Sequence, residues 1–131
     1  MNIRDAENQL FNEWRNKYLD KSFVIDGCPN PDVYLQEKRK VVFVLKDGNL
    51  REPSPSDTIN DRTYDQRDEL EKTPNLWWNT IGRWAYFLRN TSDSWDVAQN
   101  VIKDENSIRE ILSHHCIVQL KKTWGCGAVT N

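Results

Sequence analysis

Two short apolar runs, at residues 41–45 and 116–120, constrain the fold of this chain more than any other feature. Both contain β-branched residues and are bounded by polar or charged positions, which is typical of strands buried on both faces. The chain between them carries mainly helical patterns. Two strands joined by a helical crossover are expected to be parallel and connected with a right-handed turn. The order of elements therefore predicts an α/β fold.

Helical spacing of apolar residues accounts for much of the remaining chain. The first helix has its apolar positions at Ile3, Ala6, Leu10, Trp14 and Tyr18. Shorter helices are expected at residues 31–36, 65–71, 95–102 and 104–112, the first of them opened by Pro31. Thr73 and Pro74 suit the start of a longer helix that ends near Asn90 and buries Trp77, Ile81, Trp84, Ala85 and Leu88.

Length and charge limit the function classes. The 131 residues fit a single domain, residues 1–131, and 18 basic against 20 acidic side chains give a net charge of −2. This balance excludes a uniformly basic protein that coats DNA. Apolar runs of membrane-spanning length and a signal-peptide core are both absent from the sequence. We therefore expect a cytoplasmic protein with no membrane partner.

The cysteines and histidines form neither a disulfide framework nor the spacing of a metal centre. Three cysteines, Cys28, Cys116 and Cys126, are too few and too scattered for a disulfide scaffold, so reduced thiols are expected. His114 and His115 lie beside Cys116, but the sequence lacks the short-spaced ligand pairs of zinc sites. The sequence therefore predicts neither a metal nor another cofactor.

Polar side chains follow both predicted strands. Lys46, Asp47 and Asn49 come after the first strand, while Gln119, Lys121 and Lys122 lie at the end of the second. Because the carboxyl ends of parallel strands share one edge of a sheet, these groups are expected to line one crevice. Asp47 would act there as a general base, and the two lysines would contact phosphate. The alternative is a solvated edge in which Asp47 caps a turn.

Adjacent tryptophans, Trp77 and Trp78, cannot both face the core from one helix, because neighbouring helical residues point about 100° apart. With Trp77 in the buried stripe, Trp78 is expected to be exposed or to line a pocket, as is Tyr64. Aromatic side chains in such positions stack on nucleobases. Packing of Trp78 against the polar segment that precedes it is the alternative.

Four blocks of the sequence resemble an uncharacterised bacterial group within the uracil-DNA glycosylase superfamily. They are FVIDG at residues 23–27, VFVLKD at 42–47, WWNTIGRWAY at 77–86 and VQLKKT at 118–123. The resemblance covers residues 10–128 and implies a three-layer α/β/α fold around a short parallel sheet. It corresponds to the front part of the superfamily's domain, so the sheet is expected to be incomplete in this chain.

The resemblance also implies roles for individual residues. Asp47 takes the place of the group that positions the attacking water, and Lys46 and Asn49 are its neighbours in the pocket. Gln119 stands where related sequences tend to have the asparagine that reads the base edge. Tyr64 or Trp78 would stack on a flipped nucleotide.

The sequence supports three hypotheses for the function of the chain. The first is a DNA-repair hydrolase that excises a base from DNA. The second is a module without catalysis that binds nucleic acid or a nucleotide. The third is an interaction fragment whose sheet is completed by a partner chain, a homodimer being one such case. Whether the chain is an enzyme is left open by the sequence.

Overall fold

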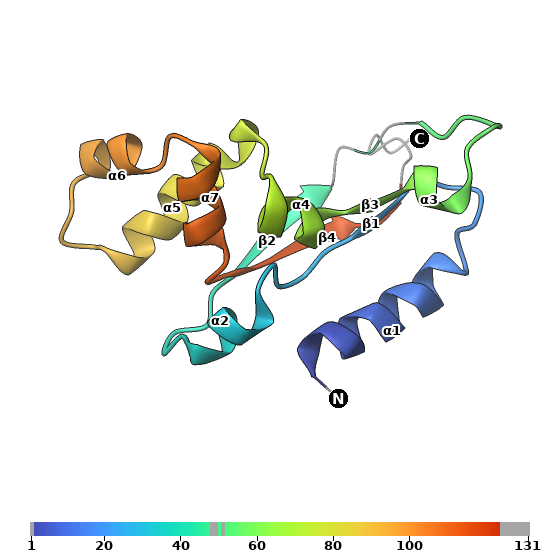
Figure 1. Cartoon of the computed structure of the whole chain (residues 1–131), viewed down its shortest axis with the longest axis horizontal. Coiled ribbons are helices and arrows are strands. Elements are labelled where there is room, and N and C mark those ends of the chain that lie inside the picture. The colour runs from blue at the N-terminus through green and yellow to red at the C-terminus, as the bar shows by residue number, and fades with distance from the viewer. Residues whose placement is uncertain (1, 48–49, 51, 124–131) are drawn as a thin grey trace, which may run out of the picture.

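The computed structural model describes residues 2–47, 50 and 52–123, and Figure 1 shows the arrangement of their helices and strands. The helices are α1 (Ile3–Arg15), α2 (Pro31–Gln36), α3 (Ile59–Arg62), α4 (Gln66–Lys72), α5 (Asn79–Arg89), α6 (Trp95–Val101) and α7 (Glu105–Leu112). A 3-10 turn, η1 (Leu76–Trp78), precedes α5, and the strands are β1 (Phe23–Ile25), β2 (Val42–Asp47), β3 (Thr63–Asp65) and β4 (Cys116–Lys121). No helix in these ranges combines the length and apolar character needed to cross a membrane.

The strands form two parallel pairs. β2 pairs with β4, from Val42 opposite Cys116 to Asp47 opposite Lys121. β1 pairs with β3 in the same parallel sense. The predicted α/β class and the parallel pairing of residues 41–45 with 116–120 are therefore confirmed.

A loose antiparallel contact between β1 and β4 connects the two pairs. Single bridges join Gly27 to Ile117 and Phe23 to Thr123. Three residues lie between the bridges on the β1 side and five on the β4 side, so a regular ladder cannot form between them. This interruption leaves room for polar side chains between the two strands, and the candidate groove described below lies next to it.

The main core lies between the β2–β4 pair and the helices α4, α5 and α7. Ile81 and Ala85 of α5 pack with Ile108 and Leu112 of α7, against Ile117 of β4. The side chain of Asp104 accepts a hydrogen bond from the backbone N–H of Ser107 and so caps the start of α7. Ile108, Ile111 and Leu112 form the buried face of this helix.

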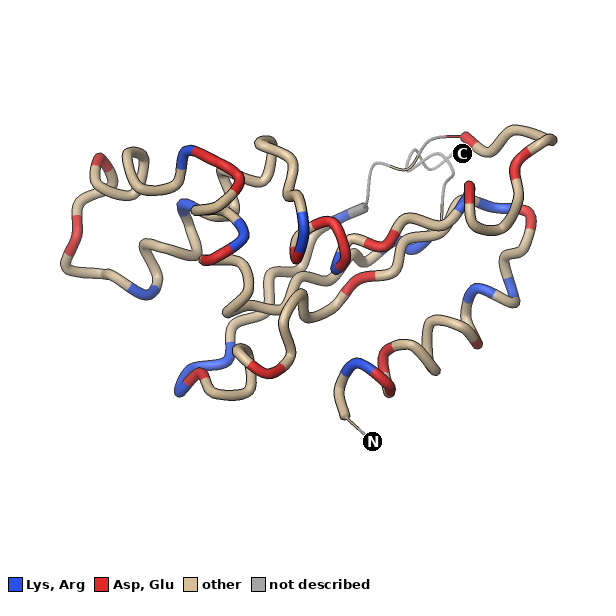
Figure 2. The backbone as a smooth tube through the Cα atoms, in the orientation of Figure 1, with Lys and Arg blue, Asp and Glu red and all other residues tan. Residues whose placement is uncertain are grey.

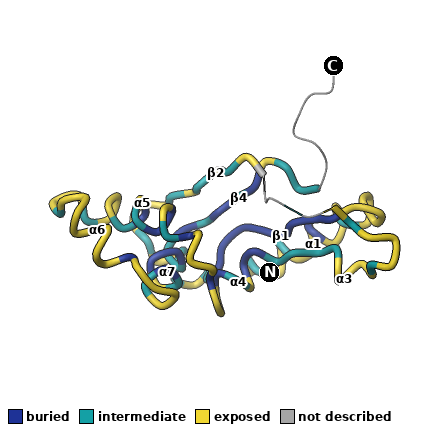
Figure 3. The backbone as a smooth tube through the Cα atoms, turned by 90° about the horizontal axis from the view of Figure 1, so that it is seen from above, coloured by how far each residue is buried: buried dark blue, intermediate teal, exposed yellow. Residues whose placement is uncertain are grey.

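The prediction that β2 is buried on both faces is wrong. Phe43 and Leu45 pack against the core, whereas Val42 is 46% and Val44 58% exposed. Figure 3 shows the same contrast, because β1 is buried and β2 is coloured as intermediate and exposed. The same prediction is wrong for β4, in which Ile117 and Gln119 are buried but Leu120 is 72% exposed. Helices cover one face of β2, and its other apolar face remains open.

The expected start and buried face of the α5 helix also need correction. Thr73 ends α4 instead of beginning the next helix, and the side chain of Asn75 caps the 3-10 turn. A 3-10 turn has three residues per turn, which rotates the following side chains relative to a continuous α-helix. Trp78 is consequently fully buried and Trp77 is 53% exposed, the reverse of the prediction. Trp84 and Leu88, expected inside, are about half exposed.

Helix α1 packs on β1 through one aromatic residue. Phe11 is buried and contacts Phe23 and Ile25 in a second, smaller core. The other predicted apolar positions, Leu10, Trp14 and Tyr18, are 36–42% exposed. The amphipathic helix is therefore confirmed, but its apolar stripe is only partly covered.

Buried Arg67 holds α1 against the rest of the molecule. Its guanidinium donates to Asp65 through Nε at 3.1 Å and Nη2 at 2.9 Å, to Glu7 at 2.9 Å and to Asn8 at 2.9 Å. Two carboxylates neutralise this cation, and its donors are satisfied in a bidentate geometry that suits a buried arginine. The network ties α1 to β3 and α4, and so fixes the helix whose end lines the groove described next.

Candidate functional site

A groove lies between the end of α1 and the end of β4. It encloses about 420 Å³ and is lined, among the described residues, by Trp14, Lys17, Tyr18, Phe23, Leu120, Lys121, Lys122 and Thr123. Asp47, the last residue of β2, lies opposite Lys121 in the parallel register. The groove is thus at the carboxyl edge of the β2–β4 pair, the edge at which α/β proteins commonly bind ligands.

Aromatic side chains form one wall of the groove. Trp14 meets Phe11 edge to face, with ring centroids 5.8 Å apart, and Tyr18 stacks on Phe23 at 6.2 Å. The backbone N–H of Tyr18 donates to the carbonyl of Arg15 at 2.9 Å, which continues the turn beyond α1. Phe11 and Phe23 therefore anchor two partly exposed rings that a planar ligand can contact.

Lysines surround these rings. Lys17 is exposed on the chain between Trp14 and Tyr18, and the Lys21 Nζ lies 5.9 Å from the centre of the Tyr18 ring. Lys122 Nζ lies 5.6 Å from the centre of the Phe11 ring. Figure 2 shows that basic and acidic residues are interspersed along the chain as a whole. The groove thus combines cations with aromatic faces in a protein whose net charge is slightly negative.

A buried polar cluster supports the groove from behind. The Asp26 carboxylate accepts a hydrogen bond from the backbone N–H of Gln119 at 2.5 Å and pairs with Lys122. Gln119 Nε2 donates to Gln66 at 2.6 Å, and Gln66 Nε2 donates to the carbonyl of Ile117 at 3.2 Å. The Asp26 carboxylate thus takes the place of a backbone acceptor in the interrupted contact between β1 and β4.

The structure places three of the predicted site residues at the groove. Lys121 and Lys122 line it, and the backbone of Asp47 lies beside Lys121. Lys46 is exposed at the end of β2, next to Asp47. Asn49 lies outside the described residues. The expected convergence of the two strand ends is therefore confirmed at the level of the backbone.

The other predicted site residues lie elsewhere. Gln119 is 1% exposed and is held by the polar cluster, so it does not reach a base in this structure. Trp78 belongs to the main core, which excludes the expected stacking role. Tyr64 is in β3, opposite Val24, and is not among the lining residues of the groove.

The sequence reasoning missed the aromatic wall. Helical spacing places Trp14 and Tyr18 in the apolar stripe of the first helix. Their i, i+4 spacing, with Lys17 between them, is the signal that could have indicated an aromatic wall. Only Phe11 reaches the core, because β1 is three residues long and offers a small packing surface. The larger rings therefore stay at the rim.

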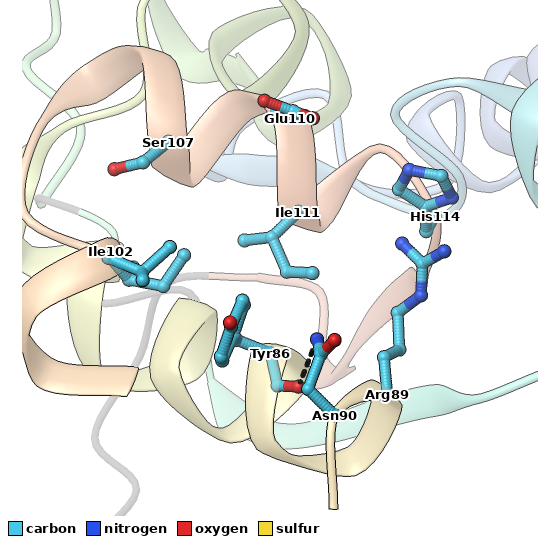
Figure 4. Close-up of a pocket in the computed structure, with 9 residues that line it drawn as sticks. Tyr86, Arg89, Asn90, Ile102, Ser107, Glu110, Ile111 and His114 are labelled. Carbon is cyan, nitrogen blue, oxygen red and sulfur yellow. Dashed lines mark hydrogen bonds between the residues drawn. The ribbon is translucent and has the colours of Figure 1, made fainter. Parts of the chain in front are cut away.

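A second cavity, of about 300 Å³, lies between α5 and α7 (Figure 4). Arg89 and His114 lie at one end of it, but both are already paired with Glu37, at 3.3 and 2.6 Å. The hydrogen bond with His114, together with the charge of Arg89, holds the pKa of Glu37 below its usual value. Because Glu37 already neutralises Arg89 and is hydrogen-bonded to His114, the cavity is a weaker candidate for an ionic ligand than the groove.

One group of potential metal ligands occurs among the described residues. Atoms of Glu7, Cys28 and Cys116 lie within 4.8 Å of one another. Both carboxylate oxygens of Glu7 are already engaged, one by Arg67 and the other by the backbone N–H of Cys28 at 2.9 Å. The groove itself is lined by lysines and aromatics and has no such ligand set among its lining residues.

Comparison with known proteins adds no relative. The chain is matched by no protein-family model, no curated protein and no solved structure. The resemblance to uracil-DNA glycosylases therefore remains a prediction from the sequence.

Proposed function

We propose that this protein binds single-stranded nucleic acid in the groove between α1 and the end of β4. The observation that carries the proposal is the combination of two partly exposed aromatic rings, Trp14 and Tyr18, with lysines at the carboxyl edge of the parallel strands. Aromatic rings stack on bases of any sequence, and lysines contact the phosphates between them.

In this proposal each side of the groove has its own role. Trp14 and Tyr18 offer faces for one or two bases, while Lys17 and Lys121 stand beside them for the phosphates. Lys122 already pairs with buried Asp26, so its main role is to hold the groove wall. The few lysines and the net charge of −2 favour modest affinity with limited salt dependence.

Fluorescence anisotropy with a labelled twelve-residue oligothymidylate tests the proposal. Trp14→Ala is expected to weaken binding about tenfold, since stacking on one aromatic contributes about 1–3 kcal/mol. Trp84→Ala removes a tryptophan of similar exposure on α5 and serves as the matched control. Equal affinities of wild type and Trp14→Ala would exclude the groove as the stacking site.

The lysines are tested by the salt dependence of the same binding. Replacing Lys17 and Lys121 together by alanine should reduce the slope of log K against log salt by about 1.4, since each phosphate contact on a single strand contributes about 0.7. Lys103→Ala, at an exposed position before α7, should leave the slope unchanged. An unaltered slope in the double variant would show that Lys17 and Lys121 do not contact phosphates.

Base excision is the second candidate, and the register of β2 favours it. Asp47 lies opposite Lys121, which brings its backbone to the edge of the groove, at the strand end where the sequence predicts a general base. Release of uracil from a single-stranded oligonucleotide by wild type, but not by Asp47→Ala, would establish glycosylase activity. Binding of the oligonucleotide without release of uracil would support nucleic-acid binding and contradict base excision.

A further inference from the structure

Cys28 and Cys116 face each other across the antiparallel contact between the end of β1 and the start of β4. Gly27 and Ile117 exchange both backbone hydrogen bonds, at 3.0 and 2.9 Å. The next pair in the same register is Cys28 opposite Cys116. A pair that follows a hydrogen-bonded pair is of the non-hydrogen-bonded kind, with Cα atoms about 4.5 Å apart in regular sheets. That separation lies within the range a disulfide spans.

The side chains agree with the register. The two Sγ atoms lie 2.9 Å apart, so the thiols point at one another and share a hydrogen bond. The backbone N–H of Cys28 donates to Glu7 at 2.9 Å and not across to Cys116, as expected for a non-hydrogen-bonded pair. Both cysteines are free thiols in this structure. Bond formation therefore requires little rearrangement of the backbone.

The charges around the pair favour a bond between the sulfurs over a bound cation. Glu7 is the third potential ligand, but its carboxylate already accepts hydrogen bonds from Arg67 and from Cys28. Arg4 lies 3.7 Å from the same carboxylate. Two guanidinium groups beside one carboxylate compensate its charge and oppose the approach of a metal ion.

We propose that Cys28 and Cys116 form a reversible disulfide when the protein meets a low-molecular-weight disulfide such as oxidised glutathione. One protein sulfur attacks the reagent and expels one thiolate, which gives a mixed disulfide. The second protein sulfur then attacks the first, and the other reagent thiol leaves. The two protein thiols are oxidised, the reagent is reduced to two thiols, and the protons of the cysteines pass to them. Cys116 is the more exposed of the pair, whereas the hydrogen bond from Cys116 lowers the pKa of Cys28 and favours its thiolate.

The bond would join positions 88 residues apart in the sequence and fix β1 against β4. The loop it closes contains β2, β3 and most of the helices, so oxidation should raise the melting temperature by on the order of 10 °C. The inference does not depend on the proposed binding function, because the cysteines are not among the lining residues of the groove.

The test treats the full chain with oxidised glutathione and maps its thiols by alkylation and mass spectrometry. A Cys126→Ser background removes the third thiol from the exchange. The expected product has lost two hydrogen atoms, links the Cys28 and Cys116 peptides, and returns to two alkylatable thiols after reduction. Cys116→Ala in the same background should yield only a mixed disulfide or no product, and should show no rise in melting temperature on oxidation.

Three results would overturn the proposal. The first is folded protein whose two thiols remain alkylatable after prolonged exposure to the oxidant. The second is a disulfide that links Cys126 in the unmodified chain while the Cys126→Ser background forms none. The third is protection of both thiols by one equivalent of zinc that also blocks the disulfide, which would identify a metal site instead.

Discussion

Lys122, just beyond the end of β4, pairs with the buried carboxylate of Asp26, just beyond β1. Asp26 is 1% exposed and also accepts a hydrogen bond from the backbone N–H of Gln119. The pair joins the two strands where their backbone ladder is interrupted. A residue that the sequence assigned to phosphate binding is therefore part of the internal structure of the site.

Removal of Lys122 should destabilise the protein. Lys122→Ala leaves a buried carboxylate without its cation, a loss that costs about 3 kcal/mol in comparable buried pairs. Urea denaturation measures the change in the free energy of unfolding. Lys17→Ala, which removes an exposed lysine of the same groove, should change it by less than about 0.5 kcal/mol. Equal effects of the two substitutions would show that the Asp26–Lys122 pair is not structurally important.

His115 should make the folding stability depend on pH. Burial, with the charges of Arg89 and His114, lowers the pKa of His115 to about 4 from an ordinary value of 6.5. Between these pH values the unfolded chain binds a proton that the folded chain does not, so stability falls as the pH is lowered. The contribution reaches about 3 kcal/mol by pH 4.

The variant His115→Leu isolates this effect. Between pH 7 and 4, the free energy of unfolding of this variant should lack the decrease that His115 causes in the wild type. The contribution of the carboxyl groups is the same in both proteins and cancels in the comparison. His114→Gln, which removes the neighbouring imidazole, should keep most of the dependence. Parallel stability curves for wild type and His115→Leu would contradict the burial of a neutral imidazole.

The two adjacent tryptophans should respond very differently to truncation. Trp78 is fully buried in the main core, and Trp78→Ala should cost about 3–5 kcal/mol. Trp77 stacks on Trp78 at 4.1 Å but is half exposed, so Trp77→Ala should cost about 1 kcal/mol. Chemical denaturation of both variants checks this order, and a larger effect of Trp77→Ala would reverse the assignment of the buried face.

Gly27 is a position where a side chain is not tolerated. Its φ of +125° is strained for other residues, and a Cβ there would lie 2.1 Å from the Glu7 carboxylate. Gly27→Ala should lower the free energy of unfolding by about 2 kcal/mol or more. Combining it with Glu7→Ala relieves the steric contact but not the backbone strain, so additive losses in the double variant would contradict the proposed clash.

The sequence predicted the parallel pair and most helices because their signals are local. The apolar runs of β2 and β4 and the capping residue Asp104 act within a few neighbouring positions. β1 and β3 are three residues long and depend on pairing with one another across the chain, so their sequences carry little signal alone. The 3-10 turn before α5 departs from the single helical period on which the predicted buried face depends. The predicted burial of Trp77 and exposure of Trp78 are therefore reversed in the structure.

The sequence predicted the position of the candidate site but not all of the residues that form it. Register follows from parallel pairing, so the meeting of Asp47 with Lys121 could be expected. The burial of Gln119 could not, because it depends on Gln66 and Asp26, which come from other elements. The exposure of Trp14 and Tyr18 likewise depends on how little of α1 the short β1 can cover.

Nuclear magnetic resonance of the indole N–H groups tests the central claim most directly. The protein has six tryptophans, and Trp14→Phe identifies the signal of the one in the groove. Addition of a twelve-residue oligothymidylate should shift the Trp14 signal and leave those of Trp84 and Trp95 unchanged. Binding that moves the Trp84 or Trp95 signal and not the Trp14 signal would contradict the account and place the nucleic-acid site elsewhere.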